Sequence, residues 1–323
     1  MIRPAPLPAL VLTAGLATRL RPLSDVRAKA ALPVAGAPLV TRILRWLHAA
    51  GIRRVVLNLH HRAPSITSIV GDGSALGLEV RYSWEADVLG SAGGPARAIP
   101  LLESDRFLIV NGDTLADVNL NAMVQQHIDT NALVTMAVVN ADPRYNAITA
   151  DASGIVRAFP NNLGTPVSAA AFGTFHFIGI QVVNATAFAG VSPDVKSETV
   201  HGIYPSVIAA RPEAVRVFRT DTQFFDIGSP RDYLDTAIAI ARREGRPVDR
   251  GAGCEVAGDA QLVDTILWDR VTIGAGARLD NCVVTDGVMV PPHAKYSHSC
   301  LVMRDNRMVA APLDGTQART IPR

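Results

Sequence analysis

The chain has 323 residues, of which 48% are hydrophobic and 19% are charged, and its formal net charge is +2. This composition can fill a large core, and the near-balance of charge gives no field that would attract nucleic acid or a membrane surface. The three cysteines show no C-x-x-C spacing, which favours a reducing cytoplasm without a structural metal. No apolar run reaches the roughly 20 residues of a membrane span, so we expect a cytoplasmic protein with one large and one smaller domain.

The first predicted element is a buried strand, Ala9–Leu12, followed by a turn of small residues. Small residues let backbone N–H groups approach phosphate oxygens, and Arg19 supplies a planar fork of donors. Lys29 comes ten residues later and can reach a second phosphate. A solvated loop between a strand and a helix is the alternative interpretation. The turn residues that we predict to contact a nucleotide are Thr13, Ala14, Gly15, Leu16, Ala17 and Thr18.

The next segments alternate between helical and strand patterns. Leu39–Ala50 places apolar residues at helical spacing, Arg53–Leu59 predicts a strand, Ile66–Val70 a short helix and Leu78–Tyr82 another strand. A second long helix is expected to end at Ile99. The order of strand, turn, helix and strand predicts a βαβ unit and therefore a parallel sheet.

Phe107–Asp113 is an uninterrupted apolar run that ends in Asn111, Gly112 and Asp113. Such a run is typical of a central parallel strand. Ligands of open α/β sheets bind beyond the carboxyl ends of the strands, so we expect Asp113 to face the site. The alternative is that Asp113 caps the following helix.

A second carboxylate, Asp226, follows Phe224-Phe225 and precedes Ile227-Gly228, ahead of a helix predicted over Asp232–Arg243. Strands are also expected over Ala132–Val139 and Phe175–Gln181. Two carboxylates more than 100 residues apart, each at a strand end beside a glycine, fit a shared metal site better than two separate caps. Mg²⁺ commonly takes one or two carboxylates together with phosphate oxygens.

The C-terminal part contains a 17-residue repeat, in which Val256, Ile273 and Val290 occupy equivalent positions. Such repeats bury their apolar side only by stacking, and the pattern predicts about three coils of a left-handed β-helix. A catalytic histidine of the hexapeptide acyltransferase type, His293 or His298, is an alternative, but three coils are few for such a groove. We therefore expect a structural or assembly role for the coils.

Together these patterns predict an α/β protein. A Rossmann-like mixed, mostly parallel sheet flanked by helices is expected over residues 1–248, and the small left-handed β-helix and tail over residues 249–323.

The first stretch resembles the signature of sugar-1-phosphate nucleotidyltransferases, the NDP-sugar pyrophosphorylases: A-G-x-G-T-R-L-x-P-L-T, then P-K-P, then L-P-V-x-G-x-P. The chain departs from it at Ala17, which replaces the second glycine, and at Ala28 and Ala30, which replace the prolines around the lysine. A methyl group at position 17 could crowd a phosphate or require an unfavourable φ. The matching residues are Ala14, Gly15, Thr18, Arg19, Leu20, Pro22, Leu23, Lys29, Pro33, Val34, Gly36 and Pro38.

Further stretches also resemble motifs of this family, and the resemblance implies a role for each. Gly90 and Ser91 fall on a turn that borders the nucleobase and ribose, Glu85 lies where a base-reading residue often stands, and Asn111 joins the nucleotide contacts. Asp113, in an N-G-D motif, and Asp226, in a D-I-G-S-P motif, correspond to the two Mg²⁺ ligands.

The sugar pocket is where the chain is least typical. The resemblance places Asn146, Gly179 and Glu198 against the sugar, but Asn146 replaces a glycine. The segment Phe159–Asn162 lacks the Glu and Lys that the family often has there. The identity of the sugar is therefore not transferred from the resemblance.

The resemblance implies that a nucleoside triphosphate and a sugar 1-phosphate give an NDP-sugar and pyrophosphate. Arg19 would stabilise the departing phosphates, Lys29 would hold the sugar phosphate, and Asp113 and Asp226 would hold Mg²⁺. GTP with mannose 1-phosphate is favoured over a UTP-dependent reaction on muramic-type sugars. Two different functions stay compatible with the sequence: a non-catalytic NDP-sugar-binding regulatory paralogue, and a cytidylyltransferase on a similar fold.

Overall fold

The computed structural model describes residues 7–142, 147–159, 173–246 and 250–314. The chain forms two compact units. The domain boundary expected near residue 248 stays a prediction, because these units divide the chain differently and residues 16–42 belong with the C-terminal part. The first unit comprises Met1–Gly15, Ile43–Ala63 and Val70–Phe224, and the second comprises Leu16–Arg42, Pro64–Ile69 and Phe225–Arg323.

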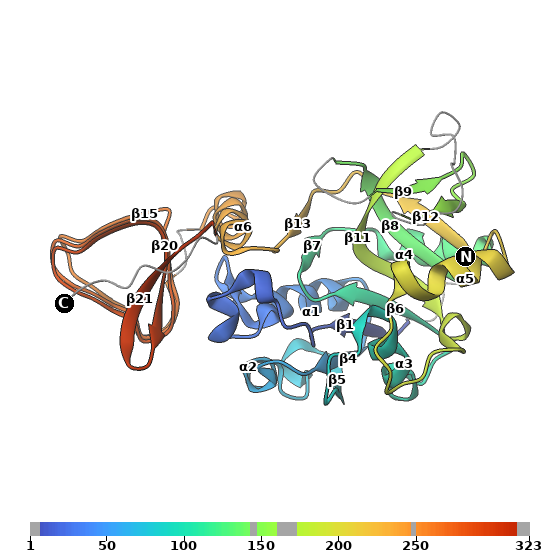
Figure 1. Cartoon of the computed structure of the whole chain (residues 1–323), viewed down its shortest axis with the longest axis horizontal. Coiled ribbons are helices and arrows are strands. Elements are labelled where there is room, and N and C mark those ends of the chain that lie inside the picture. The colour runs from blue at the N-terminus through green and yellow to red at the C-terminus, as the bar shows by residue number, and fades with distance from the viewer. Residues whose placement is uncertain (1–6, 143–146, 160–172, 247–249, 315–323) are drawn as a thin grey trace. The chain divides into compact units, whose positions relative to one another are not determined.

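The first unit is built on a mixed sheet (Figure 1). Its strands are β1 Ala9–Leu12, β4 Arg54–Leu59, β5 Glu79–Trp84, β6 Arg106–Asn111, β8 Val134–Asn140, β9 Ala147–Ala150, β10 Val156–Ala158, β11 Gly173–Asn184 and β12 Val215–Arg219. The central order β5-β4-β1-β6 is parallel throughout, as the βαβ pattern predicts. β11 is antiparallel to β6, β8 and β9, and β12 is parallel to β8. The α/β class with a mixed sheet and parallel centre is thus confirmed.

The helices are α1 Leu39–Ala49, α2 Ala63–Val70, α3 Gly90–Leu102, α4 Leu120–Asp129, α5 Tyr204–Ala210 and α6 Pro230–Arg243. α3 packs against β1, β4 and β5, α4 against β8 and β11, and α5 against β10 and β12. The apolar residues that predict α1 are buried because they share one helical face. α6 begins two residues earlier than expected, because Ser229 accepts a hydrogen bond from the Asp232 N–H and Pro230 follows this cap.

Residues 16–42 of the second unit, called the signature loop below, contain little regular structure. Short helical turns span Thr18–Leu20, Leu23–Asp25 and Lys29–Ala31, and the strands β2 Pro33–Val34 and β3 Ala37–Pro38 form a small hairpin. Two further short strands, β7 Thr114–Ala116 and β13 Phe224–Asp226, accompany the motifs predicted to form the site.

The C-terminal strands wind as stacked coils with a triangular outline (Figure 1). They are β14 Glu255–Val256, β15 Gln261–Val263, β16 Ile266–Leu267, β17 Thr272–Ile273, β18 Arg278–Val284, β19 Met289–Val290 and β20 Lys295–Arg304. The strands β14 to β18 each pair in parallel with the strand one repeat later, and the register joins the residues that the 17-residue repeat aligns, such as Val256 with Ile273 and Ile273 with Val290. Residues 250–314 are called the coils below.

A hairpin that the repeat does not predict follows the third coil. β21, Arg307–Pro312, runs antiparallel to β20. The turn residues Asp305 and Asn306 have φ of 50° and 58°, the conformation of a type I′ turn. This hairpin ends the stack of parallel strands.

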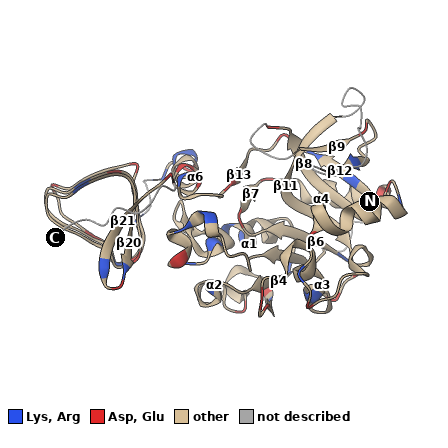
Figure 2. Cartoon of the chain, in the orientation of Figure 1, with Lys and Arg blue, Asp and Glu red and all other residues tan. Residues whose placement is uncertain are grey.

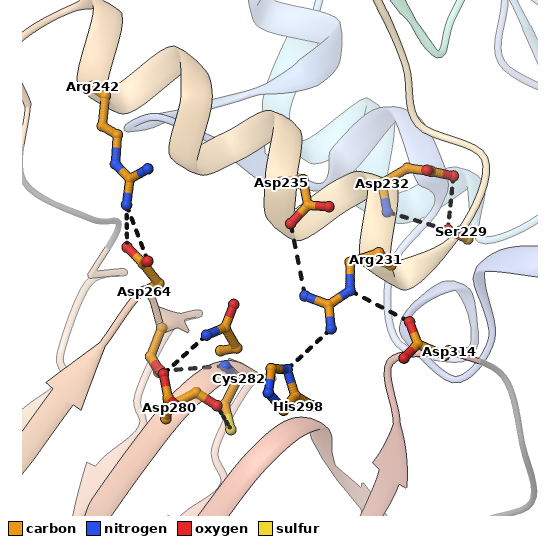
Figure 3. Close-up of polar contacts among 12 residues, drawn as sticks. Ser229, Arg231, Asp232, Asp235, Arg242, Asp264, Asp280, Cys282, His298 and Asp314 are labelled. Carbon is orange, nitrogen blue, oxygen red and sulfur yellow. Dashed lines mark hydrogen bonds and ion pairs between the residues drawn. The ribbon is translucent and has the colours of Figure 1, made fainter.

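Figure 3 shows the polar contacts between α6 and the coils. The Arg242 guanidinium donates to both carboxylate oxygens of Asp264, at 2.8 and 3.0 Å. Arg231 donates to Nδ1 of His298 at 3.0 Å and to Asp314 at 3.4 Å. His298 therefore contributes to the attachment of the helix, which favours a structural role over the acyltransferase interpretation.

No helix within the described residues is long and apolar enough to cross a membrane. Positive and negative side chains are interspersed along the chain (Figure 2). The three cysteines are free, and burial raises the pKa of Cys282 to about 11, so this thiol packs as a small apolar side chain.

Candidate active site

The turn after β1 is held by a buried asparagine of the neighbouring strand. The backbone N–H groups of Thr13 and Ala14 donate to Asn58 Oδ1, at 2.6 and 3.3 Å, and the Thr13 hydroxyl donates to the Asn58 carbonyl. Asn58 was missed by sequence reasoning, although a buried amide in the apolar run of β4 is itself a signal, because burial without a partner is costly. The N–H groups of Thr13 and Ala14 are thus engaged within the protein, while Gly15 is exposed.

Glu85 continues this network. Its side chain is 5% exposed, Oε1 accepts from Asn58 Nδ2 at 2.8 Å, and Oε2 accepts from the Leu89 N–H at 2.9 Å. Both carboxylate oxygens therefore join β4 to the segment before α3. Base reading by Glu85 stays a prediction, and the contacts that the structure does give it are structural.

The start of α3 meets a segment that lies about 100 residues later in the chain. Ser91 Oγ donates to Glu198 Oε2 at 2.6 Å, and the Thr199 N–H donates to Ser91 Oγ at 2.8 Å. Gly90 has φ of 78°, and a Cβ built there would lie 2.6 Å from the Ser197 carbonyl, so only glycine fits. The structure thus brings together Gly90 and Ser91, predicted to contact the nucleotide, and Glu198, predicted to contact the sugar.

Asn111, Asp113 and Gly179 lie together at the carboxyl end of β6. Gly179 of β11 packs against Asn111, since a Cβ at Gly179 would lie 2.6 Å from Asn111 Nδ2. Asp113 is half-buried and follows the strand by two residues, and its Oδ1 accepts from the Thr114 hydroxyl at 3.3 Å. Asn146 and the segment 160–162 lie outside the described residues.

In the second unit, the signature loop and the D-I-G-S-P motif meet. Asp226 ends β13, and Gly228 follows it just before α6. A Cβ built on Gly228 would lie 3.7 Å from Arg19 Nη1, which places the guanidinium beside this motif. Arg19 is exposed and Asp226 is half-buried. Two residues 207 positions apart (226 minus 19) therefore belong to one region of this unit.

Ala17 and Ala28 show how the chain accommodates its departures from the family signature. Ala17 has φ of 48° and ψ of 45°, the left-handed conformation that the absent glycine would adopt without strain. Its carbonyl accepts from the Leu20 N–H at 3.0 Å and from Ser24 Oγ at 2.9 Å. The Ala28 N–H donates to Ser65 Oγ at 3.0 Å, a bond that proline could not form. Lys29 follows directly, half-buried.

Within the described residues there is no cluster of three or more His, Cys, Asp or Glu side chains that could hold a metal ion. Asp113 of the first unit and Asp226 of the second are the carboxylates that the sequence predicts to bind a divalent cation. Both are half-buried carboxylates at strand ends, and carboxylate oxygens are the ligands that Mg²⁺ prefers alongside phosphate oxygens. Each carboxylate taken by itself is thus of the ligand type that a divalent cation takes alongside the phosphates of a nucleotide.

Strand-end carboxylates, and a turn of small residues followed by cations, are features that α/β proteins use to bind phosphate groups beyond the carboxyl ends of their strands. The model of the Nucleotidyl transferase family matches residues 8–243, so the chain belongs to this family, and specifically to its sugar-1-phosphate nucleotidyltransferases, which are enzymes.

Two relatives and one solved structure show what this chain is similar to. Mannose-1-phosphate guanylyltransferase of Mycobacterium tuberculosis is 31% identical over 294 residues, which cover 87% of this chain and 80% of the relative. N-acetylmuramate alpha-1-phosphate uridylyltransferase of Neisseria meningitidis is 44% identical over 118 residues, 36% of this chain and 51% of the relative. The crystal structure of HddC from Yersinia pseudotuberculosis, 22% identical, covers 72% of this chain and 99% of HddC with a TM-score of 0.60, which supports the fold.

Proposed function

We propose that this chain transfers a nucleoside monophosphate group from GTP to mannose 1-phosphate in the presence of Mg²⁺, giving GDP-mannose and pyrophosphate. The observation that carries the proposal is the meeting of Arg19 with the D-I-G-S-P motif in the second unit. A cation from the phosphate-binding turn beside a motif that carries a carboxylate is the arrangement that phosphoryl chemistry requires.

The reaction is an in-line displacement. A phosphate oxygen of the sugar 1-phosphate attacks the α-phosphorus, the new P–O bond forms, and the bond to the β-phosphate oxygen breaks so that pyrophosphate leaves with its electrons. The nucleophile is already an anion, so no general base is required. The protein contributes position and charge stabilisation.

Each predicted residue then has one task. Arg19 stabilises the negative charge that builds on the leaving phosphates, and Lys29 holds the sugar phosphate against the α-phosphate. Asp113 and Asp226 would hold Mg²⁺, which when bound neutralises charge on the α-phosphate. The second part of the turn, Gly15–Thr18, in which Ala17 is half-buried and the other residues are exposed, lies along the nucleotide, while Asn58 fixes the residues before it.

We choose the base and the sugar by how much of the chain a relative covers, rather than by the percentage identity over a short segment. The mycobacterial guanylyltransferase matches most of the chain, whereas the higher identity to the uridylyltransferase is confined to 36% of it. We therefore place GTP with mannose 1-phosphate first and UTP with a muramic-type sugar second. A regulatory paralogue that binds an NDP-sugar is the third candidate, because Ala17 departs from the signature and lies in a strained conformation.

The test is pyrophosphate release with Mg²⁺, each nucleoside triphosphate, and a panel of mannose, glucose, N-acetylglucosamine and N-acetylmuramic acid 1-phosphates. Release with GTP and mannose 1-phosphate alone supports the first assignment, and release with UTP and an N-acetylated sugar supports the second. Absence of pyrophosphate release with every substrate pair, together with retained binding of an NDP-sugar, supports the regulatory paralogue and overturns the enzyme proposal.

Removal of a charge-stabilising group tests the residue roles. Asp113→Asn and Lys29→Ala should each lower kcat by roughly 10²–10³, as for loss of one preorganised charge-stabilising group. Asp117→Asn and Lys295→Ala are matched controls at exposed positions and should keep kcat unchanged. Near-normal turnover of the Lys29 or Asp113 variant would refute its assigned role.

We further propose that residues 249–323 form a left-handed β-helix appended to a catalytic domain of residues 1–248, that the protein is cytoplasmic, and that the coils mediate a homo-oligomer. Light scattering of the purified chain measures the oligomeric state directly, and a monomer at micromolar concentration would contradict this last proposal.

A further inference from the structure

Arg27 lies in the signature loop between Arg19 and Lys29, and the coils bind it. Its Nε and Nη2 donate to the two carboxylate oxygens of Asp286, at 2.8 and 2.6 Å, and Nη2 also donates to Asp269 at 2.6 Å. The Arg27 side chain is only 18% exposed. A bidentate fork with a second carboxylate fixes the direction of the guanidinium as well as its place.

The two aspartates belong to the repeat. Asp269 and Asp286 are 17 residues apart, so they occupy the same position on successive coils. Asp269 Oδ1 accepts from the Ala252 N–H at 2.8 Å, and Asp286 Oδ1 accepts from the Asp269 N–H at 3.1 Å. Each carboxylate is thus held by a backbone N–H of the coil before it, in addition to its contact with Arg27.

A second connection lies on the other side of Lys29. The Tyr233 hydroxyl of α6 donates to the Pro33 carbonyl at 2.7 Å and accepts from Trp268 Nε1 at 3.0 Å. Tyr233 and Trp268 are fully buried and pack edge to face. The Arg27 guanidinium lies over the Trp268 ring, 5.2 Å from its centroid. Arg27 therefore contacts the coil residues Trp268 and Asp269 directly, and Pro33, on the other side of Lys29, is linked to Trp268 through Tyr233.

We propose that Arg27, Asp269 and Asp286 are positioning residues through which the coils hold Lys29 at the site of reaction. The inference rests on the proposed function, in which Lys29 holds the sugar phosphate. In addition to the role in assembly proposed above, it gives the coils a role in catalysis by the same chain. The physical reason is that the position of Lys29 depends on how the residues around it are held, and displacement of a reacting group by about 1 Å can cost 10²-fold in rate.

Two variants and one control separate positioning from general stability. Arg27→Ala removes the fork, and Asp286→Asn keeps the shape of the side chain while it removes one charge. Asp264→Asn breaks the Arg242–Asp264 pair, another contact between α6 and the coils, which does not involve the signature loop (Figure 3). Thermal unfolding of all three reports their stability.

If the coils position Lys29, Arg27→Ala should lower kcat about 10- to 100-fold, following the cost of a displacement below 1 Å. KM for the nucleotide should change less than threefold, and Arg27→Lys should recover only part of kcat because lysine lacks the planar fork. Asp286→Asn should lie between wild type and Arg27→Ala. Unchanged kcat in Arg27→Ala, or an equal fall in Asp264→Asn, overturns the proposal.

Amide hydrogen exchange supplies a readout that needs no activity. Exchange of residues 28–33 should rise in Arg27→Ala and Asp286→Asn but not in Asp264→Asn, and unchanged exchange overturns the inference. If the wild-type chain releases no pyrophosphate with any substrate pair, the proposed function fails, and with it the catalytic role of Lys29. The exchange result still decides whether the coils order this segment.

Discussion

At the scale of single residues, Ala17 departs from the family signature and has a strained, left-handed backbone conformation. Left-handed backbone costs an alanine roughly 1 kcal/mol. The conformation persists because the Ala17 carbonyl accepts hydrogen bonds from the Leu20 N–H and the Ser24 hydroxyl. Ala17 also lies, half-buried, in the turn that we propose to line the nucleotide.

Replacement of Ala17 by glycine should therefore improve nucleotide binding more than it improves the stability of the fold. Relief of about 1 kcal/mol of strain is offset in part by the greater entropy of glycine in the unfolded chain, so the free energy of unfolding should change by less than about 1 kcal/mol. KM for the nucleotide should fall about fivefold if a similar energy becomes available on binding.

Ala35→Gly is the matched control, because Ala35 also has a positive φ, 47°, but lies in the β2–β3 turn. It should shift the urea midpoint by a similar amount and leave KM for the nucleotide unchanged. An equal change of KM in both variants would show that the effect of Ala17 is not local to the turn.

At the scale of elements, α4 is attached to the sheet through a buried histidine. His127 is 1% exposed, with Nδ1 at 2.9 Å from Thr135 Oγ1 and Nε2 at 3.2 Å from Asn184 Oδ1. The Asn184 oxygen accepts and the Thr135 hydroxyl can donate, so the geometry suits a neutral ring protonated on Nε2. Burial lowers the pKa of His127 to about 4.

The lowered pKa predicts a loss of stability in mild acid. Between the folded pKa of about 4 and the ordinary value of 6.5, the unfolded chain binds the proton more readily, so stability is complete above pH 6.5 and falls as the pH falls toward 4. Between pH 7.5 and 5 the loss from this one group should be about 2 kcal/mol. Urea unfolding at the two pH values measures it.

His127→Gln is the control for this prediction, since its side chain does not titrate. Its free energy of unfolding should be lower at pH 7.5 and should change less between the two pH values by about 2 kcal/mol. A pH dependence identical to that of the wild type would mean that other groups carry it.

At the scale of the whole molecule, the coils are part of the core of the second unit rather than a separable tail. Trp268, fully buried, packs on Tyr233 of α6, and Arg27 of the signature loop pairs with Asp269 and Asp286. Removal of the coils would expose the buried face of α6 and leave the signature loop without these partners.

A chain ended after residue 248 should therefore be less stable and almost inactive. Loss of a buried aromatic contact costs about 3–5 kcal/mol, and 1 kcal/mol corresponds to about 2–4 °C in a chain of this size, so Tm should fall by roughly 10 °C or more. Circular dichroism and pyrophosphate release measure the two effects. A truncated chain with wild-type Tm and kcat would show that the coils are an independent appendage.

Local pattern predicted many of the elements and the register between the coils. Apolar periodicity located β1, α1, β4 and β6 to within a residue or two at most ends, and the 17-residue repeat aligned the residues that pair between coils. The signature placed Arg19 and the motif around Asp226 in one site, and within the second unit Arg19 does lie beside Gly228 of that motif. Periodicity suffices here because it reports directly which side of a strand or helix is buried.

Only the tertiary structure decided which partners the polar residues take. In the sequence, Arg27, Asp269 and Asp286 look like ordinary surface charges. Asp269 lies 242 positions after Arg27 and Asp286 lies 259 positions after it, so no local pattern predicts these pairs. The Asn58–Glu85 pair is invisible for the same reason, although it changes the interpretation of Glu85. A hydrogen bond or ion pair depends on where two chain segments pack, and that is fixed by the burial of the whole core rather than by the residues on either side of each group.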